Sequence, residues 1–143
     1  MTRPSTPLSW SELACRDGTP YPEAWGDRAR ALGEVFEDFR AAVGGSPLVI
    51  GSAYRTPPGN RRCGGSARSQ HLSGRALDCY PPAAMLLAEF RTLARDQADA
   101  APRIGGFGLY RWGVHFDIRP RRAGRLVVWN KLRAGTRLHD RRA

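Results

Sequence analysis

The chain has 143 residues, enough for one domain with a buried core but too few for two domains of ordinary size. Apolar residues make up 41% and charged residues 25%, which excludes a disordered chain, and no stretch approaches the ~18 apolar residues of a membrane-spanning helix. The formal net charge is +10 and is carried almost wholly by arginine, because Lys131 is the only lysine. Such a surface suits any polyanion, so charge alone selects no partner.

The first third of the chain has the pattern of helical scaffold. Ser9 to Glu12 has the form of a capping box and predicts a short helix that ends near Asp17. From Pro22 to Val43, apolar residues recur every three or four positions, which predicts an amphipathic helix packed on the core. We expect Gly44 and the glycine after it to end this helix.

The N-terminus and the cysteines bear on location. Residues 1–7 lack the apolar run of a secretory signal, which predicts a soluble protein made in the cytoplasm without an export signal of its own. Three cysteines, an odd number, argue against a disulfide framework. We expect Cys15, Cys63 and Cys79 to be free thiols, with a Cys63–Cys79 bridge as the alternative.

The middle of the chain alternates strands and loops. Leu48 to Tyr54 is short, apolar and bounded by prolines, which predicts a buried strand. Thr56 to Gln70 is rich in glycine and proline and predicts a long loop at the rim of a cleft. Ser73 to Tyr80 is predicted as a strand whose alternation puts Asp78 and Cys79 on opposite faces.

The last third adds one helix and three strands. Pro82 to Arg95 predicts a second amphipathic helix, followed by a loop to Pro102. Gly106 to Tyr110 and Val114 to Arg119 predict antiparallel strands joined by a tight turn, and residues 125–129 predict an edge strand. The sequence therefore predicts a single α+β domain in which an antiparallel sheet packs against two main helices.

We expect this domain to take in residues 1–130. Residues 131–143 form a basic C-terminal tail in which His139 is predicted to be solvated rather than a ligand.

Three residues have the chemistry of a metal site. His71 and Asp78 are separated by six residues, several of them small, and His115 would be the third ligand. Two imidazoles and one carboxylate suit zinc, and three protein ligands leave the fourth position to water, as in catalytic sites. The sequence thus predicts one Zn²⁺ per chain in a hydrolytic site. Two alternatives are an ordinary loop histidine beside a turn aspartate, and a structural zinc cluster of Cys63, His71 and Cys79.

A family resemblance favours the catalytic site. The motifs that carry it are Ser52-Ala53-Tyr54-Arg55-Thr56-Pro57, Ser69-Gln70-His71-x-x-Gly74-x-Ala76-x-Asp78, Gly105-Gly106-Phe107-Gly108-Leu109-Tyr110 and His115-x-Asp117-Ile118-Arg119. In this order and spacing they resemble the zinc D-alanyl-D-alanine carboxypeptidases and related cell-wall peptidases of the hedgehog-type fold, from about Leu8 to Trp129. The resemblance implies that His71, Asp78 and His115 bind zinc and that Arg55 faces the reacting carbonyl of the substrate.

The sequence departs from the family pattern at the position of the general base. Many relatives carry a carboxylate a few residues before the last histidine, but residues 110–114 contain none. Asp117 is the nearest candidate, and a role in orienting His115 through its distal N–H fits equally well. Arg55 suits a developing oxyanion or a substrate carboxylate.

Other residues are predicted to contact substrate. Ser69, Tyr110 and Trp112 are expected to bind it, although both aromatic residues could instead be packing residues.

The expected function is zinc-dependent hydrolysis of peptide bonds in bacterial peptidoglycan, either at the terminal D-alanine or within the stem peptide. A compact basic chain without a signal suits a phage lysis protein that acts at the cell wall after release, or that is carried in a virion. The expected partners are stem peptides and, through the basic surface, anionic cell-wall polymers or virion proteins. A non-catalytic binding or structural module of the same fold is the alternative. No specific nucleic acid is expected as a partner, since the sequence has a positive net charge but no helix-turn-helix, zinc-finger or other nucleic-acid-binding motif.

Overall fold

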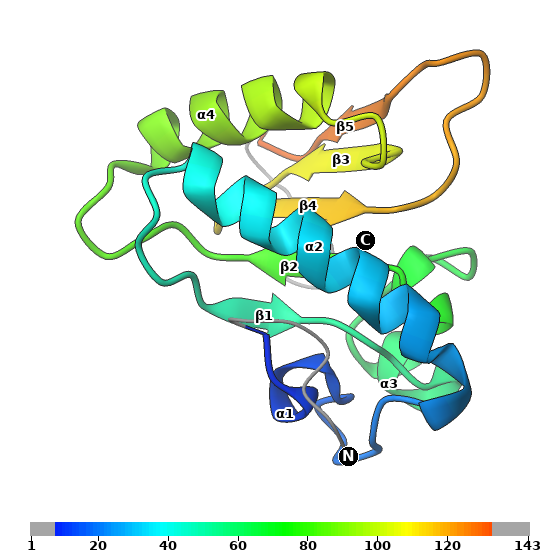
Figure 1. Cartoon of the computed structure of the whole chain (residues 1–143). Helices are drawn as coiled ribbons and strands as arrows, with labels where there is room; N and C mark the ends of the chain where they lie inside the picture. Colours follow the sequence, from blue (N-terminus) through cyan, green and yellow to red (C-terminus); the bar gives the residue numbers. More distant parts are fainter. Residues whose placement is uncertain (1–7, 133–143) are drawn as a thin grey trace.

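The computed structural model describes residues 8–132, which form an α+β fold around one five-stranded sheet, as predicted (Figure 1). The strands are β1 (Ile50–Ser52), β2 (Ala76–Cys79), β3 (Gly106–Leu109), β4 (Val114–Asp117) and β5 (Val127–Asn130). The helices are α1 (Trp10–Leu13), α2 (Gly26–Ala42), α3 (Pro57–Arg62) and α4 (Leu87–Ala100), with the 3-10 turns η1 (Glu23–Trp25) and η2 (Gln70–Ser73). His139 and residues 133–143 of the predicted tail lie outside the described residues.

The sheet has the strand order β1-β2-β4-β3-β5. The first four strands pair antiparallel, whereas β5 pairs with β3 in parallel at the edge. Gly106 begins β3 and is the partner both of Asp117, where β4 ends, and of Val127, where β5 begins. The connection from β4 therefore returns to the end of the sheet that it left, and β5 has to run in the direction of β3.

One face of the sheet packs on the helices, and the other carries Asp78 and the two histidines. On one face of the sheet, α2 and α4 lie side by side (Figure 1). Apolar side chains of the strands and of both helices form one core there. Phe39 of α2 packs on Phe116 of β4 at a ring-centroid distance of 4.7 Å and edge-on against Phe90 of α4 at 6.2 Å. Cys79 belongs to this core, whereas Asp78 contacts two histidines on the other face, so their predicted separation is confirmed.

Two of the N-terminal predictions hold, one of them with a shorter helix. The Ser9 capping box is present, with Ser9 and Glu12 bonded in both directions. Helix α1 nevertheless ends at Leu13 rather than near Asp17, because Ala14 adopts an extended conformation. The predicted helix from Pro22 to Val43 is present as η1 followed by α2.

The predicted loop after β1 is wrong at its start, because Thr56 caps α3, which begins at Pro57. The Thr56 side chain accepts a hydrogen bond from the Gly59 N–H at 3.0 Å, and Pro57 occupies the first turn, where its missing N–H costs nothing.

The second long helix begins and ends about five residues later than predicted, as α4. Pro82 to Met85 forms a separate turn closed by a 3.0 Å backbone bond, and Leu86 is extended and 76% exposed. The predicted loop after Arg95 is helical up to Ala100.

The cysteines are free thiols, as expected, and the alternative Cys63–Cys79 bridge is absent. Within residues 8–132, no helix combines the length and apolar character needed to cross a membrane.

Candidate metal centre

A short turn and a strand fix the spacing of the first two candidate ligands. His71 lies in η2, whose first amides are capped by Ser69: the Ser69 hydroxyl accepts a hydrogen bond from the His71 N–H at 3.2 Å. Gly74 ends the turn with a left-handed φ of 69°, and a Cβ there would lie 2.8 Å from the Tyr21 hydroxyl oxygen. The chain then enters β2 and reaches Asp78. Glycine is required at position 74 both for the conformation and for the space.

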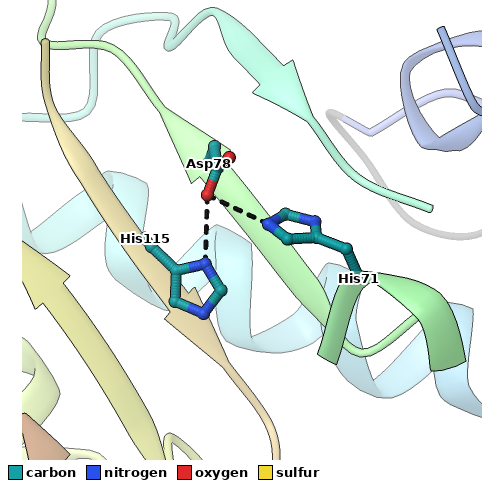
Figure 2. A group of neighbouring side chains, drawn as sticks. All are labelled: His71, Asp78 and His115. Carbon is teal, nitrogen blue, oxygen red and sulfur yellow. Dashed lines mark hydrogen bonds and ion pairs between the residues drawn. The ribbon is translucent and has the colours of Figure 1, made fainter. Parts of the chain in front are cut away.

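The structure brings the three predicted ligand residues together, as Figure 2 shows. Asp78 Oδ1 lies 3.1 Å from His71 Nε2 and 3.0 Å from His115 Nδ1. All three side chains are buried, with exposures of 0 to 1%. Metal–ligand bonds of about 2.0–2.1 Å in a tetrahedral site put ligand atoms roughly 3.3 Å apart, so this cluster fits one metal ion.

In each imidazole, the ring nitrogen that faces away from Asp78 has a hydrogen-bond partner, and this partner determines which nitrogen carries the proton. His71 Nδ1 lies 2.5 Å from the Ala53 carbonyl oxygen, which can only accept, so Nδ1 carries the hydrogen and Nε2 is left with its lone pair. His115 Nε2 lies 2.8 Å from Asp117 Oδ2, which leaves Nδ1 as the inner nitrogen. In both rings, the nitrogen that faces Asp78 is the one available to bind a metal.

The charge states also suit a metal. Burial lowers the pKa of His71 to about 4, so this imidazole is neutral at pH 7. Burial acts to raise the pKa of Asp78, but its interactions with His71 and His115 outweigh burial and hold the pKa below its ordinary value. Burial acts to lower the pKa of His115, but the carboxylates of Asp117 and Asp78 outweigh it and raise the pKa. Negative charge that favours a proton on His115 also favours a metal cation there.

Arg55 is the partner of the second Asp78 oxygen. Its guanidinium, 3% exposed, donates to Asp78 Oδ2 at 3.1 Å, Asn60 Oδ1 at 3.1 Å and Ser52 Oγ at 3.0 Å. The two oxygens of Asp78 are thereby divided, with Oδ2 held by Arg55 and Oδ1 facing the histidines. Sequence reasoning missed this support of a ligand; the implied contact of Arg55 with the substrate carbonyl stays a prediction.

Asp117 lies behind His115, on the side away from Asp78. Its carboxylate is fully buried, and Arg119 donates to both oxygens at 2.7 Å while His115 Nε2 bonds Oδ2. Burial acts to raise the pKa of Asp117, but the bonds from Arg119 and His115 outweigh it and hold the pKa below its ordinary value. An ionised carboxylate with both oxygens engaged is suited to orienting His115.

A cavity of about 260 Å³ opens beside His115. Its other lining residues are Ser66, Arg68, Ser69, Gln70, Arg119 and Trp129. The Trp129 ring lies 5.0 Å from the His115 ring, and its Nε1 donates to the Tyr110 hydroxyl at 2.7 Å. Sequence analysis gave Trp129 no part in the site, because only the pairing of β5 with β3 brings it there.

The three predicted substrate contacts differ in placement. Ser69 lines the cavity, so its contact with substrate stays a prediction. Tyr110 has no exposed surface, and its hydroxyl accepts the hydrogen bond from Trp129, so its contact with substrate also stays a prediction. Trp112, half-buried, stacks on Tyr110 at 4.9 Å and lies 5.6 Å from the Tyr80 ring. These contacts agree with the packing alternative for both aromatic residues.

The alternative zinc cluster of Cys63, His71 and Cys79 does not form. Within the described part of the chain, the residues with metal-binding geometry are His71, Asp78 and His115.

Gly108 makes room for Trp129, which yields a testable expectation. A Cβ at position 108 would lie 2.3 Å from Trp129 Nε1, so Gly108→Ala should displace the indole from His115. We expect a stability loss of about 1–3 kcal/mol in denaturant unfolding. Gly26→Ala is the matched control, because a Cβ there meets no atom within 4 Å. Equal unfolding midpoints for the two variants would contradict the packing described.

The chain matches a known protein family. The model of a family described as Peptidase M15 matches residues 7–117, a range that contains His71, Asp78 and His115 and ends at Asp117. No curated protein matches the chain. Strand β5 and Trp129 lie beyond the matched range.

Proposed function

The chain belongs to the Peptidase M15 family, a family of metal-dependent peptidases, and from this we propose that it is a zinc enzyme that cleaves peptide bonds in bacterial peptidoglycan. The observation that carries the proposal is the buried group of His71, Asp78 and His115, in which His115 also lines an open cavity. A buried cluster of this kind is costly to fold unless its charges are satisfied, and a bound cation satisfies them.

The donor set supports zinc in particular. Two imidazole nitrogens and one carboxylate oxygen are common zinc ligands, and three of them leave a coordination position for water. When bound, zinc lowers the pKa of such a water to roughly 7 and polarises a carbonyl oxygen. The chain's own residues then hold the ligands in place: Ala53 orients His71, Asp117 orients His115, and Arg55 orients Asp78.

Asp117 is assigned a positioning role in this proposal rather than that of general base. Its hydrogen bonds to His115 and Arg119 occupy both oxygens, which supports this choice between the two roles open from sequence.

The variant Asp117→Asn tests that assignment. It keeps the shape of the side chain but removes the charge that holds His115 and Arg119, so metal affinity or activity should fall by roughly 10–100-fold. Competition with a chelator measures the affinity. Asp99→Asn, which removes an exposed carboxylate paired with Arg95 on α4, is the control. Unchanged metal affinity with almost complete loss of turnover would instead make Asp117 the general base.

The biological setting belongs to the proposal as well. The net charge of +10 suits the anionic polymers of a cell wall, where the enzyme would act on stem peptides after release from the cytoplasm or as part of a virion. A phage lysis enzyme would combine these features.

Digestion of purified peptidoglycan tests the function directly. We expect the zinc-loaded protein to release new fragments and the chelated protein to release none. Mass spectrometry separates removal of terminal D-alanine from cleavage within the stem peptide. A zinc-loaded, folded protein that releases nothing would overturn the proposal and leave the non-catalytic module, which the lack of a carboxylate in residues 110–114 favours.

A further inference from the structure

A larger cavity adjoins the one beside His115. A second cavity, of about 730 Å³, is lined by Gln70, Arg119, Pro120, Arg122, Arg125, Leu126 and Val127. Gln70 and Arg119 line both cavities, so the two cavities adjoin, and we refer to the pair as the cleft. The cleft begins at His115 and extends along the segment that connects β4 to β5. Its size is that of a site for a small ligand or a short peptide segment.

The charges around this cleft are of one sign. Its lining includes four arginines, Arg68, Arg119, Arg122 and Arg125, and no acidic residue. Arg119 is held by Asp117, whereas Arg68, Arg122 and Arg125 are exposed and form no ion pair with any residue of the described range 8–132. Arginines that line a cleft without acidic partners leave their donors available to an anionic ligand.

Two of these arginines are held in place by the backbone. Arg122 and Arg125 form a β-bridge closed by a 3.1 Å bond from the Arg125 N–H to the Arg122 carbonyl oxygen. Ala123 and Gly124 between them both have positive φ, 53° and 71°, which is the conformation of a tight two-residue turn. Both arginines therefore start from fixed backbone positions on the two arms of one turn.

The rest of the lining is apolar. Pro120, Leu126 and Val127 contribute it, and Val127 is 48% exposed. Arginines beside an apolar floor suit carboxylates carried on aliphatic side chains. Besides His115, the only aromatic residue in the cleft lining is Trp129. With so few aromatic rings, the cleft offers little surface on which successive nucleic-acid bases could stack.

We propose that this arginine cleft binds the carboxylates of an acidic peptide substrate, with Arg122 and Arg125 as the residues that select it. The inference rests on the proposed function, since it assigns the cleft to the same substrate. It predicts that the enzyme prefers stem peptides with free side-chain carboxylates over the same peptides with those carboxylates amidated.

Two peptides and two double variants test this. The ligands are a stem pentapeptide that ends in D-alanyl-D-alanine and has free side-chain carboxylates, and its amidated counterpart. R122Q/R125Q removes the proposed contacts, and R30Q/R95Q removes the same charge from exposed arginines of α2 and α4. Calorimetry on the chelated full chain measures binding without hydrolysis, and steady-state kinetics on the zinc-loaded chain measures KM and kcat.

We expect wild type and R30Q/R95Q to favour the free peptide by about tenfold in Kd and KM, and R122Q/R125Q to lose that preference with kcat nearly unchanged. Equal preference in R122Q/R125Q and wild type overturns the inference. So does a DNA oligomer that binds tighter than the peptide and is lost only in R122Q/R125Q. If the protein binds the free peptide selectively but does not cleave peptidoglycan, the proposed function is wrong and the inference stands. If it cleaves peptidoglycan but shows no preference for free carboxylates, the inference is wrong and the proposed function stands.

Discussion

Replacing Asp78 by alanine is expected to abolish metal binding and peptide hydrolysis together and to destabilise the fold. Asp78 Oδ1 faces His71 and His115, so the change removes one ligand of the candidate metal. Asp78 Oδ2 is bonded to Arg55, so the change also leaves a buried guanidinium without its carboxylate, which costs about 3–5 kcal/mol. Atomic absorption measures the metal content, and denaturant unfolding measures the stability.

Two further variants keep this test decisive. Asp78→Asn keeps the volume of the side chain but offers a neutral amide, so a folded protein with little metal is expected. His139→Ala removes the third histidine of the chain, which is predicted not to be a ligand, and should keep both metal and activity. Full zinc content in folded Asp78→Asn would refute the ligand assignment.

Arg55→Ala is expected to weaken metal binding as well as stability. The guanidinium joins Asp78, Asn60 and Ser52, and its removal leaves Asp78 Oδ2 buried without a counter-charge. The expected loss is again about 3–5 kcal/mol in unfolding, with a fall in zinc affinity because the carboxylate is no longer oriented. Arg55→Lys keeps the charge but cannot reproduce the planar fork, so it should recover only part of the loss.

Chelator competition and kcat, measured on the same preparations, separate this role from contact with substrate. If zinc affinity is unchanged and only kcat falls, Arg55 acts on the reacting carbonyl, as the family resemblance implied.

The residues of the candidate metal site were predictable because their positions depend on short chain segments and on the pairing of neighbouring strands. His71 and Asp78 are joined by one turn and one strand, and Asp78 is the direct cross-strand partner of His115. The long helix α2 was predictable because its apolar residues repeat with helical period over many turns.

The errors arise where tertiary contacts or local turns outweigh such patterns. Leu86 fits the apolar period of the predicted second helix but lies before α4 and is exposed, since residues 82–85 form a turn. The support that Arg55 gives to Asp78 could not be predicted either, because it depends on tertiary contacts that also join Arg55 to Asn60 and Ser52. Trp129 could be assigned to the cleft only once the direction of β5 was known.

Along strand β3, glycines alternate with large apolar residues. Gly106 and Gly108 lie on the face of the sheet that carries the candidate metal ligands, and Phe107 and Leu109 lie on the face covered by the helices. A slip of one residue against β4 would turn every side chain to the opposite face. The helices would then pack against two glycines, while a phenylalanine and a leucine would collide with Asp117 and Trp129. Each apolar side chain withdrawn from the core costs about 1.5–3 kcal/mol, so the two glycines that leave room for Asp117 and Trp129 also make the alignment of β3 with β4 nearly unique.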